Sequence, residues 1–157
     1  MRAARPGTEA AMTLRAPLIL ALLTLSLQAS AAPDVDPSTL YSISTRGSST
    51  RLKSGEKGVF VLAIQSKAGA HLSEEAPLRL ALSGKNVTPE KTQLEAKDSV
   101  APRVAGREFT DSRFEVPLRA AAAPGAASVE ARITFFVCTE TLCARQQKVV
   151  SLPIEVY

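Results

Sequence analysis

The sequence predicts an all-β fold in which antiparallel strands pack as a sandwich. Three observations support this prediction. Short apolar segments alternate on a period of two and are separated by turn residues, no long amphipathic helix lies between them, and about 120 residues remain once an N-terminal targeting segment is set aside. Together they favour an immunoglobulin-like β-sandwich, with a small closed barrel as the alternative.

The N-terminal 31 residues have the pattern of a cleavable signal peptide. Arg2, Arg5 and Arg15 precede an apolar run at Leu18–Leu27, and small residues follow at Ala29–Ala31. The apolar run spans about ten residues, whereas a membrane-spanning helix needs about twenty. We therefore predict cleavage after about Ala31 and a periplasmic or secreted protein that does not span the membrane after cleavage.

The predicted domain boundaries follow from this segment. Residues 1–31 are assigned to the signal peptide, with translation starting at Met1 or at Met12. Residues 32–39 have little apolar content and contain two prolines, so we predict a flexible leader there. Residues 40–157 are then left for the sandwich domain.

Charge and composition exclude several classes of function. The whole chain carries a formal charge of +4, but three arginines and one glutamate lie in the signal peptide, so the mature charge is about +2. Such a balance provides no basic surface for nucleic acid. Aromatic residues make up 4% of the chain and Trp is absent, which disfavours sites built from exposed rings. A single His and the lack of a G-x-S-x-G motif argue against a hydrolase.

Six segments are predicted as strands. In chain order they are Tyr41–Thr45, Val59–Gln65, Leu78–Leu82, Arg113–Arg119, Val129–Cys138 and Lys148–Val156. The first and third show the weakest alternation. The second is almost continuously apolar and lies between two glycines, Gly58 and Gly69, which is typical of a central strand.

Alternation in the last three strands predicts which side chains face the core. These are Phe114, Val116, Leu118, Val129, Ala131, Ile133, Phe135, Val137, Val150, Leu152, Ile154 and Val156. Pro117 has no N–H to donate, so its strand is predicted to lie at an edge or to carry a bulge there. The segment Ala120–Ser128 contains a Pro-Gly pair between two strands and is predicted as a loop.

The two cysteines stand at the shoulders of a predicted β-hairpin. Cys138 ends one strand, Thr139–Leu142 form the connection, and Cys143 begins the run into the last strand. Side chains of the first pair outside the ladder can face each other, so a disulfide across the hairpin mouth is predicted, and an oxidising compartment makes it the default state. The period of two also places Cys138 on the outer face, where a partner protein can reach its sulfur.

Three uses of this cysteine pair stay open on spacing alone. A structural bridge would pin the hairpin, although closing a loop of about six residues is worth only about 2 kcal/mol. Redox exchange is the second use, with four intervening residues instead of the two of a thioredoxin motif. A metal site would need more ligands than two cysteines and His71 supply, so neither a metal nor a cofactor is predicted.

The segment Ile133–Cys143, followed by Lys148–Val156, resembles the C-terminal hairpin of the N-terminal periplasmic domain of the thiol-disulfide interchange protein DsbD, in the disulfide bond corrector-like family. Lys67–His71 fits the same succession of strands, and the resemblance covers about Tyr41–Val156. It implies an immunoglobulin-like sandwich whose paired cysteines accept electrons from a membrane-embedded domain. The same cysteines then pass the electrons to periplasmic oxidoreductases.

The resemblance implies that Cys138 and Cys143 are a redox pair. Their partners would be periplasmic thiol-disulfide oxidoreductases or a separate membrane electron donor, because the family's transmembrane and thioredoxin-like portions are not in this chain. The family usually has five residues between its cysteines, and its aromatic shield is not evident at Ala68–Pro77. His71 is a candidate to stabilise a thiolate, or else a loop residue bonded to backbone. Arg145 is a second candidate modulator, or else a solvated arginine.

Overall fold

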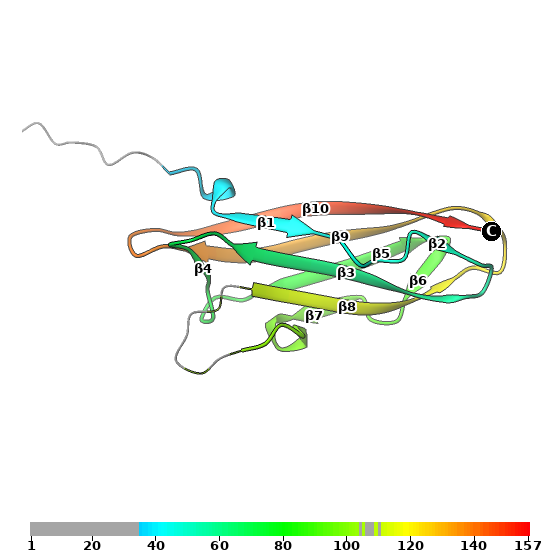
Figure 1. Ribbon diagram of the computed structural model, residues 1–157, viewed down its shortest axis with the longest axis horizontal. Coiled ribbons are helices and arrows are strands. Elements are labelled where there is room, and N and C mark those ends of the chain that lie inside the picture. Colours follow the sequence, from blue (N-terminus) through cyan, green and yellow to red (C-terminus); the bar gives the residue numbers. More distant parts are fainter. Residues whose placement is uncertain (1–34, 104, 106–108, 110) are drawn as a thin grey trace, which may run out of the picture. The chain divides into compact units, whose positions relative to one another are not determined.

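The computed structural model describes residues 35–103, 105, 109 and 111–157 (Figure 1). The predicted signal peptide at residues 1–31 lies outside the described residues. The strands are β1 (Tyr41–Ser44), β2 (Arg51–Leu52), β3 (Lys57–Ser66), β4 (His71–Leu72), β5 (Arg79–Lys85), β6 (Val87–Pro89), β7 (Gln93–Glu95), β8 (Asp111–Ala120), β9 (Gly125–Cys138) and β10 (Cys143–Val156). Two short 3-10 helices accompany them, η1 (Pro37–Thr39) and η2 (Ala96–Asp98).

The strands form two sheets that pack face to face (Figure 1). One sheet has the order β1-β3-β8-β6, and the other has the order β2-β10-β9-β5-β7, with β4 paired to the end of β9. Neighbouring strands are antiparallel except for β2 and β10, which are parallel. These orders correspond to the two sheets of an immunoglobulin domain, so the predicted immunoglobulin-like antiparallel sandwich is confirmed.

The core between the sheets is built from the alternating residues that the sequence assigns to the inner faces. Those at 1% exposure or less are Phe114, Val116, Leu118, Val129, Ala131, Ile133, Phe135 and Val137. Leu152, Ile154 and Val156 are buried as well, and Val150 is partly buried against the core. The central strand β3 adds Phe60, which has no exposed surface. Each large side chain buried in this way stabilises the fold by about 1.5–3 kcal/mol.

Two predicted boundaries are wrong, and both errors have the same cause. β9 begins at Gly125, so the second half of the predicted loop Ala120–Ser128 is strand. β10 begins at Cys143, five residues before the predicted start at Lys148. In both places the residues lack apolar alternation, and the cross-strand ladder between β9 and β10 holds them in strand conformation instead.

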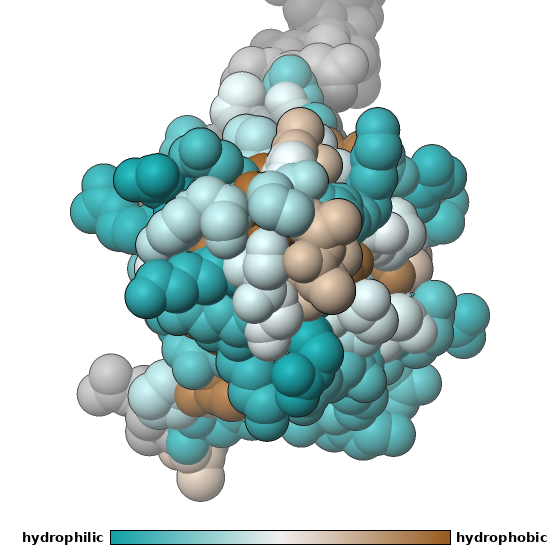
Figure 2. Space-filling model, turned by 90° about the vertical axis from the view of Figure 1, so that its right-hand side faces the viewer, coloured by the Kyte–Doolittle hydropathy of each residue, from teal (hydrophilic) through white to brown (hydrophobic). Residues whose placement is uncertain are grey.

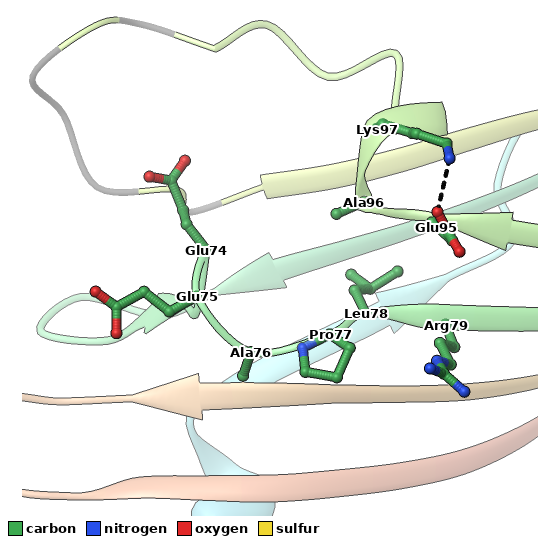
Figure 3. Close-up of a pocket in the computed structure, with 9 residues that line it drawn as sticks. All are labelled: Glu74, Glu75, Ala76, Pro77, Leu78, Arg79, Glu95, Ala96 and Lys97. Carbon is green, nitrogen blue, oxygen red and sulfur yellow. Dashed lines mark ion pairs between the residues drawn. The ribbon is translucent and has the colours of Figure 1, made fainter.

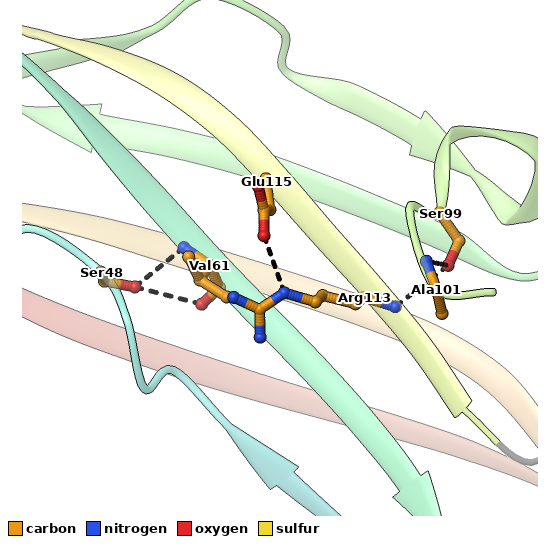
Figure 4. A network of polar contacts seen from close by, with 6 residues as sticks. All are labelled: Ser48, Val61, Ser99, Ala101, Arg113 and Glu115. Carbon is orange, nitrogen blue, oxygen red and sulfur yellow. Dashed lines mark hydrogen bonds and ion pairs between the residues drawn. The ribbon is translucent and has the colours of Figure 1, made fainter.

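Serine hydroxyls and a short loop cover the edges of the first sheet (Figure 4). The Ser48 hydroxyl accepts a hydrogen bond from the Val61 N–H (2.8 Å) and donates one to the Val61 carbonyl (3.1 Å). On β8, the Ser99 hydroxyl accepts from the Arg113 N–H (3.0 Å), while the Val100 N–H donates to the Arg113 carbonyl (2.7 Å). These contacts satisfy backbone groups of β3 and β8 where no neighbouring strand reaches them.

Pro117 lies at a local edge within β8. β6 pairs with β8 only from Leu118 to Ala120, and beyond that point the Pro117 carbonyl accepts a hydrogen bond from the Glu90 N–H (2.9 Å). The missing N–H of Pro117 therefore interrupts no ladder bond. Pro117 therefore lies at an edge, as predicted from its missing N–H, although β8 as a whole lies between β3 and β6 in the sheet.

The end of the sandwich that bears the C-terminus is mostly hydrophilic, with scattered apolar side chains (Figure 2). Near the C-terminus, the Arg51 guanidinium lies 4.9 Å from the centre of the Tyr157 ring and forms an ion pair with Glu155 (2.9 Å). Both Arg51 and Glu155 are exposed, so the ion pair is worth less than about 1 kcal/mol. These contacts join the end of β10 to β2, its parallel neighbour.

The first described element, η1, lies within the predicted leader at residues 32–39. The Asp36 carboxylate caps this helix by accepting a hydrogen bond from the Ser38 N–H (2.9 Å). That bond, assisted by the nearby Lys148 ammonium, lowers the pKa of Asp36 below its ordinary value. The last residues of the leader therefore lie against β10 rather than leading away from the domain.

Candidate functional site

The predicted disulfide is present at the tip of the β9–β10 hairpin. The two strands are in register from Cys138 opposite Cys143 to Gly125 opposite Val156. The Thr139 N–H donates to the Leu142 carbonyl (2.7 Å), and since hydrogen-bonded pairs alternate along an antiparallel ladder, the cysteines form a non-hydrogen-bonded pair. Such pairs bring side chains closest together, and here the two Cα atoms are 4.0 Å apart and the sulfurs are bonded.

The two cysteine residues differ in exposure, and this corrects one prediction. Cys138 stands on the outer face of β9, as its parity predicts, but only 6% of it is exposed, so the expectation that a partner reaches this sulfur is wrong. Cys143 is the exposed member of the pair. The cause is that Cys138 has neighbours on both sides, β10 on one and the two-residue strand β4 on the other.

β4 places His71 beside the disulfide. His71 is the direct cross-strand partner of Cys138, which in turn is the partner of Cys143. Directly opposed residues of antiparallel strands point to the same face of a sheet, so His71, Cys138 and Cys143 form one row across three strands. The sequence offered His71 as a candidate neighbour of the thiols, and the sheet register brings it there.

A loop between β4 and β5 interrupts this edge of the sheet. β4 and β5 both pair with β9. The six residues that connect them, 73–78, face only two residues of β9, Phe135 and Phe136. The Ser73 N–H still donates to the Phe136 carbonyl (3.0 Å), and the excess residues after Ser73 leave the ladder. Glu74 and Glu75 lie in this loop and line a hollow on each side of it.

The first of these hollows contains the disulfide. Its volume is about 380 Å³ and its lining includes His71, Glu74, Glu75, Phe109, Cys138 and Cys143. The Phe109 carbonyl accepts a hydrogen bond from the Leu72 N–H (2.7 Å), which fixes Phe109 to β4. Phe109, which is 5% exposed, thus brings an aromatic side chain to this hollow from a distant part of the chain.

Arg103 joins Phe109 to the β4–β5 loop. Its guanidinium lies 4.3 Å from the centre of the Phe109 ring and 3.5 Å from the Glu74 carboxylate. Both partners are attracted to the same cation, one through its ring face and the other through its charge. The exposed ion pair adds little stability by itself, but it orients the Glu74 carboxylate at the rim of the hollow.

The second hollow, of about 310 Å³, lies on the other side of the loop (Figure 3). Lys97 forms an ion pair with Glu95 there (2.8 Å) and lowers the pKa of that carboxyl. Arg79 also lines this hollow, and it is the cross-strand partner of Glu95. The lining also contains Ala76, Pro77, Leu78 and Ala96, so this hollow combines apolar side chains with charged groups of both signs.

Arg145 lies outside the disulfide hollow. It is exposed and stands opposite Phe136, on the same outer face of the sheet as Cys143. It therefore lies two residues along β10 from Cys143 and is not among the residues that line the hollow around Cys138. One residue of the hollow, Phe109, could not be found from the sequence, because its proximity to the cysteines depends on a contact between distant parts of the chain.

No group of three or more His, Cys, Asp and Glu side chains within residues 35–157, as far as they are described, is arranged to hold a metal ion. In the same described part of the chain, no helix is long and apolar enough to cross a membrane.

Fold and site together define the class of this domain, which is an immunoglobulin-like sandwich with a disulfide across the tip of its longest hairpin. No family model matches the chain, and no curated protein matches it. Solved structures do. Native α2-macroglobulin of Escherichia coli is 18% identical over 74% of this chain, with a TM-score of 0.43, and the chain spans only 6% of that protein's length.

Two smaller structures match over most of their own length. A cohesin module of a family 33 glycoside hydrolase from Clostridium perfringens is 12% identical, with 74% of this chain and 94% of the module covered and a TM-score of 0.41. AggA, the major subunit of aggregative adherence fimbriae type I from Escherichia coli, is 11% identical, with the same coverage and TM-score. At these identities the similarity concerns the fold alone.

Proposed function

We propose that this chain takes part in thiol-disulfide exchange, with Cys138 and Cys143 alternating between a disulfide and a dithiol. The proposal includes export of the protein, as the predicted signal peptide and the disulfide suggest, and a role like that of the N-terminal domain of DsbD. Its partners would be periplasmic thiol-disulfide oxidoreductases or a separate membrane electron donor.

The observation that carries the proposal is the unequal exposure of the two cysteine residues. Exchange begins when a thiolate attacks one sulfur of a disulfide in line, and the other sulfur leaves as a thiolate. Cys143 is the exposed residue of the pair and would receive the attacking group, and the buried Cys138 would be the leaving group. A protonated His71, in the same row as Cys138, would stabilise the departing thiolate and so favour the reduced form.

The small structural value of the bridge also supports an exchange role. The cysteines are the last of fourteen consecutive register pairs between β9 and β10, so the hairpin is already held by its backbone ladder. Closing so short a loop is worth only about 2 kcal/mol. A bridge that contributes little to the fold is free to be opened and closed in a catalytic cycle.

The reverse reaction uses the same groups. With the pair reduced, a Cys143 thiolate would attack a partner disulfide, form a mixed disulfide and release one partner thiolate. Cys138 would then attack the Cys143 sulfur and release the second. Two electrons and two protons pass to the partner, and the Cys138–Cys143 bond forms again.

A redox titration of the purified protein tests the proposal. The fraction oxidised is read by thiol trapping in glutathione and dithiothreitol buffers. A midpoint near about −200 mV or higher is expected for an exchange protein, and a midpoint below about −300 mV would mark a structural bridge. The variants His71→Ala and His71→Gln test the imidazole, and both should lower the midpoint because neither side chain can become positively charged and stabilise the thiolate.

The competing candidate is a non-catalytic binding or assembly module in which the disulfide only pins the hairpin. The observation that favours it is the burial of Cys138, since a covered sulfur is slow to react. This candidate predicts a bridge that resists mild reductants. It also predicts that serine at either cysteine leaves the redox state of every periplasmic partner unchanged.

A further inference from the structure

One long edge of the second sheet is open within the described residues. β10 pairs with β9 along its whole length, but on its other side only Glu155 and Val156 have a strand partner, in β2. From Cys143 to Pro153 no described strand lies along this edge. The first sheet differs, since serine hydroxyls and the 99–101 loop cover its edges at Val61 and Arg113.

The hydrogen-bonding pattern identifies which backbone groups of β10 face outward. Hydrogen-bonded and non-hydrogen-bonded pairs alternate along the ladder, starting from the hydrogen-bonded pair Thr139–Leu142. The N–H and C=O groups of odd-numbered β10 residues therefore point away from β9. The bonds at the covered end agree, because the Glu155 N–H donates to the Thr50 carbonyl (2.9 Å) and the Tyr157 N–H donates to the Leu52 carbonyl (3.0 Å). Pro153, which has no N–H, stands at such an outward position.

The residues with outward backbone groups in the open part are Cys143, Arg145, Gln147, Val149 and Ser151. All five side chains are exposed on the outer face, and Val149 is 58% exposed. Two interactions reach even-numbered residues of this stretch: the Tyr41 hydroxyl donates to the Gln146 side chain (3.1 Å), and Asp36 of the leader, whose helix η1 contacts β10, interacts electrostatically with Lys148. One outward acceptor is satisfied within the strand, since the Gln146 amide donates to the Arg145 carbonyl (3.0 Å).

We propose that this open edge of β10 is the docking site for an extended, acidic segment of the exchange partner, which adds to the sheet as a further strand and brings its cysteine to Cys143. The inference rests on the proposed thiol-disulfide exchange and specifies how the partner is recognised. The open edge begins at Cys143, the exposed cysteine, so docking and chemistry share one strand.

Distances in antiparallel sheets make this geometry workable. A residue hydrogen-bonded opposite Cys143 would have its Cα about 5.5 Å away, within the 4.4–6.8 Å range of disulfides. The partner thiolate would attack the Cys143 sulfur, forming the mixed disulfide while Cys138 leaves as a thiolate and takes up a proton. A second partner thiol would then displace Cys143, so that the partner dithiol is oxidised and this chain's disulfide is reduced.

Charge complementarity favours an acidic partner, and it opposes a second copy of this chain in the two registers centred on Arg145 or Lys148. Arg145 and Lys148 both lie on the open stretch and are exposed. Two copies paired about a two-fold axis at either residue would place like charges directly opposite each other, which is destabilising. An incoming strand with carboxylates opposite Arg145 and Lys148 would form favourable cross-strand pairs instead.

The test uses a capped nine-residue peptide as the thiol donor. It carries a C-terminal cysteine, two glutamates placed opposite Arg145 and Lys148 in antiparallel pairing, and threonine, valine or alanine elsewhere. Its rate of disulfide exchange with the oxidised full-length protein is compared with that of glutathione, which is too small to form a strand. The Gln147→Pro variant removes one outward N–H without touching the ladder to β9, as Pro153 already does in the same strand.

We expect Gln147→Pro to slow the peptide about tenfold, since a docking hydrogen bond is lost and the ring obstructs the added strand, while glutathione reacts as with the unmodified protein. Gln147→Ala keeps the N–H and is the matched control, expected to react at the unmodified rate with both thiols. Arg145→Glu should slow the peptide, whereas Arg132→Glu, further along the outer face, should leave its rate unchanged.

If Gln147→Pro slows exchange with the peptide no more than exchange with glutathione, the open edge of β10 is not a docking site. The proposed thiol-disulfide exchange is unaffected by that result. If neither thiol opens the disulfide at potentials near −200 mV, on the order of those of exchange proteins, the proposed function fails and the docking inference falls with it. A concentration-dependent dimer in sedimentation, abolished by Gln147→Pro, would assign the edge to a second copy and overturn the partner.

Discussion

The two halves of the β9–β10 hairpin share one ladder but differ in their surroundings. Between Leu152 and Val156, every second side chain of β10 is buried in the core and β2 covers part of the outer edge. Between Cys143 and Val149, no β10 side chain is fully buried, and the outer edge has no strand partner among the described residues. The buried half of β10, together with the buried β9 residues Phe135 and Val137 opposite the exposed half, therefore keeps the exposed half extended although one of its edges is open.

The largest effect is expected from damage to the buried half. Ile154 is 4% exposed and lies in the core cluster, so Ile154→Ala should lower the free energy of unfolding by about 3 kcal/mol through lost burial and a residual cavity. Urea unfolding followed by circular dichroism measures this loss. A loss below about 1 kcal/mol would mean that the buried half does not support the hairpin.

The matched control in the exposed half is Val149→Ala. Because Val149 is 58% exposed, its truncation should change the free energy of unfolding by less than about 0.5 kcal/mol in the same urea experiment. A loss comparable with that of Ile154→Ala would contradict the division of the hairpin into a stabilising and an exposed half.

A smaller effect than that of Ile154→Ala is expected from removal of the disulfide. The Cys138→Ser/Cys143→Ser double variant should be less stable by about 2 kcal/mol, because the bridge closes a short loop on a hairpin that its ladder already holds. The reduced, unmodified protein is the control and should show the same loss in urea. A loss of about 4 kcal/mol or more would show that the bridge, and not the ladder, holds the exposed half.

The smallest effect concerns the contact between η1 and the exposed half. The Ser38 N–H lowers the pKa of Asp36 below 3.8, and Lys148 on β10 acts in the same direction. A carboxyl whose folded pKa is lowered stabilises the fold above its unfolded pKa, and this contribution disappears as the pH falls through the folded value. Amide resonances of Ser38 and Lys148 should therefore shift together at acidic pH, below about pH 4.

Asp36→Ala provides the control for this titration. It should abolish the shared transition of the Ser38 and Lys148 resonances and leave those of the buried half, such as Ile154, unchanged. An Asp36 carboxyl that titrates at or above 3.8 in the folded protein would contradict the capping hydrogen bond.

The inner faces of the long strands were predictable because burial follows the period of two. Every inward residue predicted in β8 and β9 is at most 1% exposed. The two-residue and three-residue strands, β2, β4, β6 and β7, could not be read from the sequence, since so few residues show no period. They form only where a longer strand offers partners.

The candidate site shows the same limit. The disulfide followed from local spacing around Cys138 and Cys143, and it is present. The burial of Cys138, the placement of His71 and the contribution of Phe109 all depend on β4, which pairs with the last two residues of β9. Local patterns report which way a side chain points, but only the long-range pairing determines what covers it.

The sheet that contains β10 is asymmetric, and this bears on how large an assembly it can form. Its opposite edge is β7, which is only three residues long and bends directly into η2. A strand received at β10 therefore meets no equally long edge across the sheet at which a next molecule could attach. Among the described residues the sheet thus offers only one long open edge, so addition of a strand as proposed would favour discrete one-to-one complexes over fibres.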